Sequence, residues 1–222
     1  MSLFEILNDW DTSIFLIING FHSPFFDNFM FLVSGKIIWI PLYASVLYVL
    51  IKNWKIEALW LILAFILCIV ISDQFASGFL KNTVKRLRPS NVDEIKGVIH
   101  LVKGYLAGGK YGFASSHASN SFGFAMLSTL ILRRKEYSIA IFIWAILISY
   151  SRIYLGAHYP LDVLGGAAIG ITSAYFCKWA LDLLHLHNPQ RPETSIQKFL
   201  SIVPLSILML SLIGIIFYSI IA

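Results

Sequence analysis

Charged residues are scarce in this sequence. Asp, Glu, Lys and Arg make up 13% of its 222 residues, whereas 58% are hydrophobic, and the mean hydropathy is +0.75. Soluble domains carry about 25% charged residues. The composition therefore excludes an ordinary soluble domain and indicates a membrane protein.

Cysteines and processing signals are also scarce. Cys68 and Cys177 both lie inside apolar runs, a pattern typical of small buried hydrophobic residues and not of a disulfide framework or a zinc site. The N-terminal stretch MSLFEILNDWDTS is acidic and has no basic segment, so we expect no cleavable signal peptide. Internal repeats and linkers are absent, so residues 1–222 are expected to form a single domain.

Long apolar runs, by contrast, are abundant. A spanning helix needs about 20 mostly apolar residues, and open sheets are excluded because lipid cannot satisfy their backbone groups. The expected spans are Ile37–Ile51, Lys55–Gln74 (or onward to Lys81), His117–Leu132, Tyr137–Tyr154, Leu161–Leu184 and Phe199–Ile221. The sequence therefore predicts an all-α integral-membrane helical bundle of about six transmembrane helices.

The expected bundle has three parts. Residues 37–184 form its main body, and residues 199–221 add an extra C-terminal transmembrane helix. Residues 1–35 are apolar but interrupted by Gly20, Pro24 and Asp27. This segment predicts one or two helices that lie at the membrane interface.

The net charge of +5 is concentrated in one connector. Its basic residues are Lys81, Lys85, Arg86, Arg88, Lys96, Lys103 and Lys110, against only Asp93 and Glu94. A basic segment beside a membrane predicts an anionic partner, and nucleic acid is excluded because no binding module surrounds it. We expect a long basic loop between the second and third spans, with four candidate headgroup-binding residues, Lys85, Lys96, Lys103 and Lys110.

Two polar fragments flank this connector on one face of the membrane. KNTVKRLRP places Lys81 and Arg88 about two helical turns apart, which predicts that both leave one face of a helix that Pro89 ends at Arg88. FASSHAS offers Ser115 or Ser116 as the N-cap of the third span. Free backbone N–H groups at such a helix start favour an anion.

A third polar fragment, SRIYLGAHYPLD, reaches the same face. Arg152 ends the fourth span, Pro160 is expected to open the fifth, and Asp162 follows in its first turn. Asp162 would fix the tautomer of His158 and leave its other ring nitrogen as an attacking lone pair. His117, from the second fragment, is then suited to protonate a leaving oxygen.

Cations, a hydroxyl and a helix start suit a phosphate group, because arginine binds phosphate oxygens in a bidentate manner. The sequence near these residues has no cluster of oxygen ligands for magnesium. We therefore expect phosphoryl transfer without a metal and without a cofactor. The cations would neutralise charge on the phosphoryl oxygens in the transition state.

The three fragments together resemble the signature of the type 2 phosphatidic acid phosphatase (PAP2) superfamily, in its bacterial integral-membrane lipid phosphatase branch. The matching parts run from Gln74 to Gly170 and read Lys81-x6-Arg88-Pro89, Ser115-x-His117 and Ser151-Arg152-x5-His158-x3-Asp162. The resemblance implies a phosphohistidine on His158, oriented by Asp162, with His117 as acid and then as base. It also implies that Lys81, Arg88, Ser115 and Arg152 hold the phosphoryl group.

One position departs from the family pattern. The second motif is usually Pro-Ser-Gly-His, whereas this chain has Ser116 before His117. Glycine would let the backbone approach the phosphate closely. Ser116 adds a side chain and a further donor to the phosphate-binding set.

The resemblance implies an enzyme that hydrolyses a phosphomonoester or pyrophosphate of a membrane lipid. The substrates that the family suggests are lipid A, undecaprenyl diphosphate, phosphatidylglycerophosphate and phosphatidate, and the basic connector favours a multiply anionic headgroup such as lipid A or a polyprenyl diphosphate. Two alternatives remain open: a phosphotransferase that passes the group to an alcohol, and a non-catalytic transporter. A transporter would be expected to show internal repeats.

Orientation does not follow from charge alone, because basic residues divide evenly between the two sets of alternate loops. When Lys81, Arg88 and Arg152 are left out of this count because they belong to the site, the signature loops have fewer basic residues than the other set. The positive-inside rule then places the signature loops outside. Membrane members of the family also face outward. We expect a multi-pass protein of the bacterial inner (cytoplasmic) membrane whose site faces the periplasm or exterior.

Two further features bear on packing. Gly166 and Gly170 form a small-xxx-small pattern, which predicts close helix packing within one chain. Asp73 and Gln74 lie near the outer end of the second span, where a charge in hydrocarbon is costly. We expect them to face the bundle interior or the interface.

Overall fold

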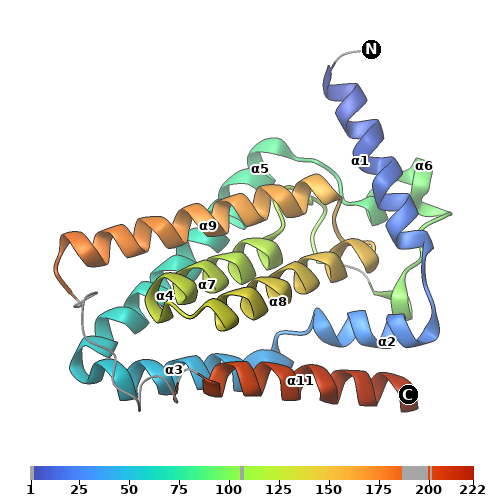
Figure 1. Cartoon of the computed structure of the whole chain (residues 1–222). Coiled ribbons are helices and arrows are strands. Elements are labelled where there is room, and N and C mark those ends of the chain that lie inside the picture. The colour runs from blue at the N-terminus through green and yellow to red at the C-terminus, as the bar shows by residue number, and fades with distance from the viewer. Residues whose placement is uncertain (1–2, 106–107, 187–199, 201) are drawn as a thin grey trace.

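The computed structural model is all-α, and it describes residues 3–105, 108–186, 200 and 202–222 (Figure 1). The long helices are α1 (Leu3–Gly20), α2 (Pro24–Val33), α3 (Ile40–Trp54), α4 (Ala58–Asp73), α7 (Ser116–Leu132), α8 (Lys135–Tyr154), α9 (Pro160–Leu183) and α11 (Ile202–Ile221). The short ones are Ile37–Trp39, Lys55–Glu57, a π-helical segment Gln74–Leu80, α5 (Lys81–Val84), Pro89–Asn91, α6 (Asp93–Lys96) and Val102–Gly104. The predicted all-α class is confirmed.

Four helical runs among the described residues are long and apolar enough to cross a membrane, namely Ile37–Val84, Lys135–Tyr154, Pro160–Leu183 and Ile202–Ile221. The first run has 48 residues and contains both α3 and α4, which meet at a turn where Lys55 has a φ of 50°. The chain thus has four to five long apolar helices that can span a membrane. The full set of six spans stays a prediction, and its residue Phe199 lies outside the described part of the chain.

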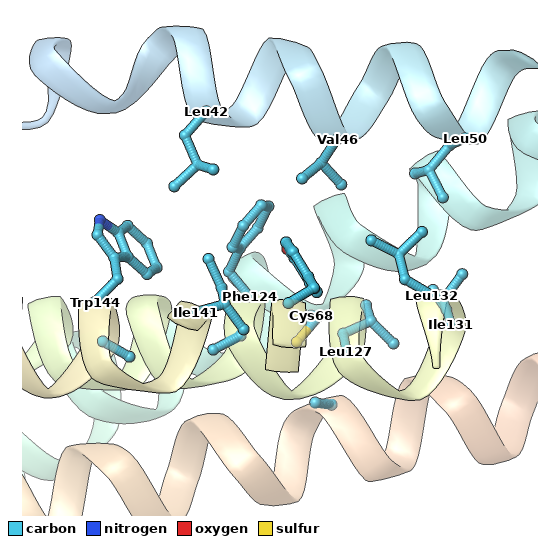
Figure 2. Close-up of a cluster of buried hydrophobic side chains, with 14 of the residues drawn as sticks. Leu42, Val46, Leu50, Cys68, Phe124, Leu127, Ile131, Leu132, Ile141 and Trp144 are labelled. Atoms are coloured by element: carbon cyan, nitrogen blue, oxygen red, sulfur yellow. The ribbon is translucent and has the colours of Figure 1, made fainter. Parts of the chain in front are cut away.

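The helices form two layers (Figure 1). Helices α4, α7, α8 and α9 make one layer, and α2, α3 and α11 lie along its lower side in the view. Between the layers, Leu42, Val46 and Leu50 of α3 point toward the side chains of α7 and α8 (Figure 2). This buried cluster also contains Cys68, and burial of such apolar surface supplies the main favourable term in folding.

The two cysteines behave as the composition predicted. Cys68 on α4 and Cys177 on α9 are both buried and free. Their thiols interact with each other across the α4–α9 contact. They pack as small side chains in the helix interface.

The predicted helix from Lys81 to Arg88 is wrong. The helix ends at Val84, where Lys85 adopts a left-handed conformation with a φ of 53°. The chain then becomes extended, and Leu87 pairs with Tyr111 in an isolated β-bridge. The backbone N–H of Arg88 donates to the Lys110 carbonyl at 3.1 Å. This long-range pairing replaces the helical hydrogen bonds, so Lys81 and Arg88 do not share a helix face.

Helices α7 and α9 approach each other at backbone distance, as the small-xxx-small pattern predicted. A Cβ atom added at Gly166 would lie 2.3 Å from the Ser115 carbonyl oxygen. One added at Gly170 would lie 2.1 Å from the Ser119 carbonyl oxygen. Glycine at these positions therefore lets the start of α7 pack directly on the start of α9, where two of the polar fragments lie.

We expect Gly170→Ala to destabilise the protein by about 1–3 kcal/mol, because the new methyl group overlaps main-chain atoms that can move only with α7. The measurement is thermal unfolding in detergent. Gly214→Ala on α11 is the matched control, since a Cβ there meets nothing within 4 Å. Equal melting temperatures for the two variants would contradict the close approach of α7 and α9.

Candidate active site

The N-termini of α7 and α9 are both capped by candidate site residues, and the cap at Ser115 was predicted. Ser115 is the N-cap of α7, and its Oγ accepts from the Ala118 N–H at 3.5 Å. Helix α9 begins at Pro160, and Asp162 Oδ2 accepts from the Tyr159 N–H at 3.1 Å. The Ser115 N–H donates to the Asp162 carbonyl at 2.9 Å. The two helix starts are therefore fastened together.

His158 lies between an arginine and a carboxylate. Its Nε2 is 2.9 Å from Arg88 Nη1, and its Nδ1 is 3.4 Å from Asp162 Oδ2. A guanidinium can only donate, so Nε2 accepts and the ring proton is on Nδ1, on the side of Asp162. Nδ1 makes no hydrogen bond among the described residues, so control of the tautomer by Asp162 stays a prediction. The imidazole is 1% exposed.

The surroundings keep His158 neutral. Burial lowers the pKa of its imidazole well below 6.5, and the charges of Arg88, Arg152 and Lys81 lower it further. A neutral imidazole has a lone pair on Nε2 at neutral pH. The ring is therefore suited to attack an electrophile.

Arg88 is held by main-chain oxygens as well as by His158. Its Nη1 donates to the Ala157 carbonyl at 2.9 Å, its Nε to the Gly109 carbonyl and its Nη2 to the Gly108 carbonyl, both at 3.1 Å. The residue is 4% exposed. These contacts fix the guanidinium against the ring edge of His158, where Nε2 carries the lone pair.

The other two predicted phosphate-binding cations also act on His158. Arg152 bonds Ser34 Oγ through Nη1 and the Tyr105 hydroxyl through Nη2 at 2.9 Å. Its Nε is buried and has no hydrogen-bond partner among the described residues. Lys81 Nζ donates to Ser77 Oγ at 3.2 Å.

The four candidate headgroup-binding lysines are separate from this cluster. The side chains of Lys85, Lys96, Lys103 and Lys110 are all exposed. Lys103 Nζ lies 5.5 Å from the Phe31 ring centroid. These lysines flank the site on its polar side and do not contribute to the buried charge around His158.

Arg86 also belongs to the site, although the sequence indicates it only as one of the basic residues of the connector. Its Nη1 is 2.6 Å from Asp11 Oδ2 and 3.1 Å from Asp162 Oδ1. Its guanidinium carbon lies 4.0 Å from the centroid of the Tyr159 ring. Asp11 Oδ1 in turn accepts from the Leu161 N–H at 2.9 Å. One arginine thus joins α1 to the carboxylate that faces His158.

A cavity of about 560 Å³ lies between α3, α4 and α7. Most of its lining is apolar, from residues such as Val46, Phe65, Ile69 and Phe124. Its polar lining residues include Lys36, Asp73, Ser116, His117 and Asn120. His117 therefore faces the cavity, whereas His158 and Arg88 are buried outside its lining.

Comparison with known proteins bears on this arrangement. The PAP2 superfamily matches residues 57–185. The chain is 47% identical over 171 residues to the lipid A 4′-phosphatase of Bacteroides thetaiotaomicron (76% of this chain, 75% of that protein). It is 35% identical over 173 residues to the lipid A 4′-phosphatase of Porphyromonas gingivalis (78% and 73%).

Solved structures show the same fold. The crystal structure of Aquifex aeolicus LpxE aligns with a TM-score of 0.55 and 26% identity, over 76% of this chain and 94% of that one. The crystal structure of the first transmembrane PAP2 type phosphatidylglycerolphosphate phosphatase from Bacillus subtilis aligns with a TM-score of 0.62 and 19% identity, over 81% and 88%. The chain therefore belongs to the PAP2 superfamily, as a multi-pass membrane lipid phosphatase.

Proposed function

We propose that this protein is a lipid A 4′-phosphatase that works through a phosphohistidine on His158. The observation that carries the chemistry is the neutral His158 ring, held with Nδ1 toward Asp162 and Nε2 toward Arg88. The substrate is proposed from the similarity to two lipid A 4′-phosphatases. The charges of Arg88, Arg152 and Lys81 around His158 support it.

In the first step, His158 Nε2 attacks phosphorus and the bond to the lipid oxygen breaks. Arg88 Nη1, which contacts Nε2, exchanges that contact for a phosphoryl oxygen. Arg152, Lys81 and Ser115 add the remaining donors, and charge on the oxygens is stabilised most strongly in the transition state. Ser116, in place of the family glycine, lines the cavity beside the same helix start.

His117 acts on the leaving group. It lines the cavity, which has the apolar walls that acyl chains need. Protonated His117 gives its proton to the departing lipid oxygen, and neutral His117 then takes a proton from water. That water attacks the phosphohistidine, the P–N bond breaks, and inorganic phosphate leaves with His158 restored.

We also infer the placement of the protein in the cell. The site sits at the ends of α7, α8 and α9, beside the exposed lysines Lys85, Lys96, Lys103 and Lys110. This arrangement supports a site at the surface of the bacterial inner membrane, on its periplasmic or exterior side, with the lysines beside the anionic headgroup. With the six proposed spans, both signature loops and the N-terminus would share that side.

The two histidines should be separable by trapping the intermediate. With an aryl phosphate, whose leaving oxygen needs no proton, His117→Ala should still form phosphoenzyme. Because this variant lacks the base that activates water, the rate of phosphoenzyme hydrolysis should fall by about 10²–10⁴-fold. Radiolabelled phosphate should therefore accumulate on the protein in an acid-labile form. His158→Ala should carry no label and release no phosphate, and label on that variant would assign the nucleophile elsewhere.

Arg86→Ala should destabilise the protein by about 3 kcal/mol, because it leaves the buried carboxylates of Asp11 and Asp162 without their shared counter-charge. Thermal unfolding in detergent measures this. Lys85→Ala, which changes an exposed neighbour, is the control for stability. In the Arg86→Ala background, Asp11→Asn should recover part of the lost stability because it removes one unpaired carboxylate. No recovery would show that the lost counter-charge does not explain the destabilisation.

The acid limb of the pH dependence of kcat/KM should lie well below pH 6.5. Attack requires neutral His158, and its lowered pKa keeps it neutral as the pH falls through 6.5. Activity is then lost only when the pH reaches the lowered value. The profile is corrected for the second ionisation of the phosphate ester, near pH 6. A corrected acid limb centred at pH 6.5 would contradict this environment for His158.

A further inference from the structure

The cavity carries a polar pair beside His117 that the catalytic steps do not use. Asp73 ends α4, and Asn120 lies on α7 three residues after His117. Residues three apart on a helix share a face, so Asn120 lies one turn further along α7 from the catalytic residue. Asn120 Nδ2 donates to Asp73 Oδ1 at 3.4 Å, and all three side chains line the cavity.

This pair presents acceptors that lack donors. Asn120 Oδ1 is shielded from solvent and has no hydrogen-bond partner among the described residues. The contact with Asn120 uses only one Asp73 oxygen. A buried acceptor without a partner costs about 1–3 kcal/mol. Rotation of the Asn120 amide would turn this oxygen toward the cavity that the residue lines. A ligand donor that holds it there would recover that free energy.

The residues on either side of the pair indicate where the donors must lie in the ligand. On α7, the cavity residue on one side of the pair is His117, where we propose that the ester oxygen is released. Along α4, Val70, Ile69 and Ile66 precede Asp73 and give the cavity its apolar wall. A ligand that fits this order has a phosphate, then a group with N–H or O–H donors, and then hydrocarbon.

We infer that Asp73 and Asn120 are specificity-determining residues that bind hydroxyl or amide N–H donors on a sugar bonded directly to the scissile phosphate. This inference rests on the proposed function and names the part of the substrate that the site reads. The bound sugar is held with its ester oxygen at His117. An N-acylated glucosamine has both kinds of donor on the ring that bears its phosphate.

A polyprenyl diphosphate does not fit the same pair. Its leaving group begins with a second phosphate, which in its ionised form has no donor for either acceptor. Hydrocarbon follows at once and would cover both acceptors without supplying a donor. Lys36 also lines the cavity, but its side chain is exposed, and no ion pair joins it to Asp73 among the described residues. The pair therefore selects against an anionic or purely apolar leaving group.

The test compares two substrates of matched size with purified protein in detergent. One is a short-chain N-acylglucosamine 4-phosphate, and the other is an alkyl phosphate with the same number of carbon atoms. Wild type should prefer the sugar by at least about tenfold in kcat/KM, which corresponds to about 1.4 kcal/mol. Asn120→Leu, which keeps the volume but removes both polar atoms, should reduce this preference to about one, whatever the absolute rates.

Ser128→Ala is the matched control. Ser128 is buried on the same helix and donates to its own Ala125 carbonyl, outside the cavity lining. This variant should keep the wild-type preference. Asp73→Asn is the second test variant, since it keeps the shape of the pair, removes its charge and should lower the preference if Asn120→Leu does not fold.

The inference is overturned if wild type shows no preference for the sugar, or if both Asn120→Leu and Asp73→Asn keep it. Lipid A itself is assayed in parallel. A protein that prefers the sugar and loses that preference in the variants, but does not dephosphorylate lipid A, would refute the proposed function and leave this inference standing. The two failures are therefore distinguishable.

Discussion

The buried carboxylate of Asp162 is the constraint on which the site depends. A carboxylate removed from water costs several kcal/mol unless charges and hydrogen bonds compensate it, and this residue is 0% exposed. Its Oδ1 pairs with Arg86, its Oδ2 accepts from the Tyr159 N–H and faces His158, and its main-chain oxygen accepts from Ser115. The compensation therefore ties the N-terminal helix α1, the extended segment at Arg86–Arg88 and the starts of α7 and α9 to one point. Orientation of the attacking imidazole follows from the same contacts.

The two histidines have different surroundings, which suit the different tasks proposed for them. His158 is buried behind Arg88, and burial and the cations around it keep the ring neutral. His117 lies on the wall of a largely apolar cavity, into which we propose that the lipid oxygen departs. The backbone contact of α7 with α9 at Gly166 and Gly170 brings these two environments together. A wider side chain in that contact would move apart the helices that carry the two proposed catalytic histidines.

Much of the fold and the site could be predicted from single segments of the sequence. Apolar runs must satisfy their backbone groups internally, so they form helices within a few residues of the expected limits. Ser115 and Pro160 start α7 and α9 because each suits the local geometry of a helix N-terminus. The spacing of His158 and Asp162 also suffices to bring a ring nitrogen toward a carboxylate. Each of these features depends on residues that are close together in the chain.

What only the tertiary structure decided are the contacts between distant segments. The helix that ends at Val84 stops there because residues 86–88 pair with residues 110–112, and no local signal names that partner. Arg86 acquires its role from Asp11, and Asn120 from Asp73, each supplied by another helix. Ser34 and Tyr105 likewise reach Arg152 from outside its own helix. Hydrophobic periodicity and capping residues report which segment is helical and where it starts, but the neighbour of a buried polar group is set by how the helices pack.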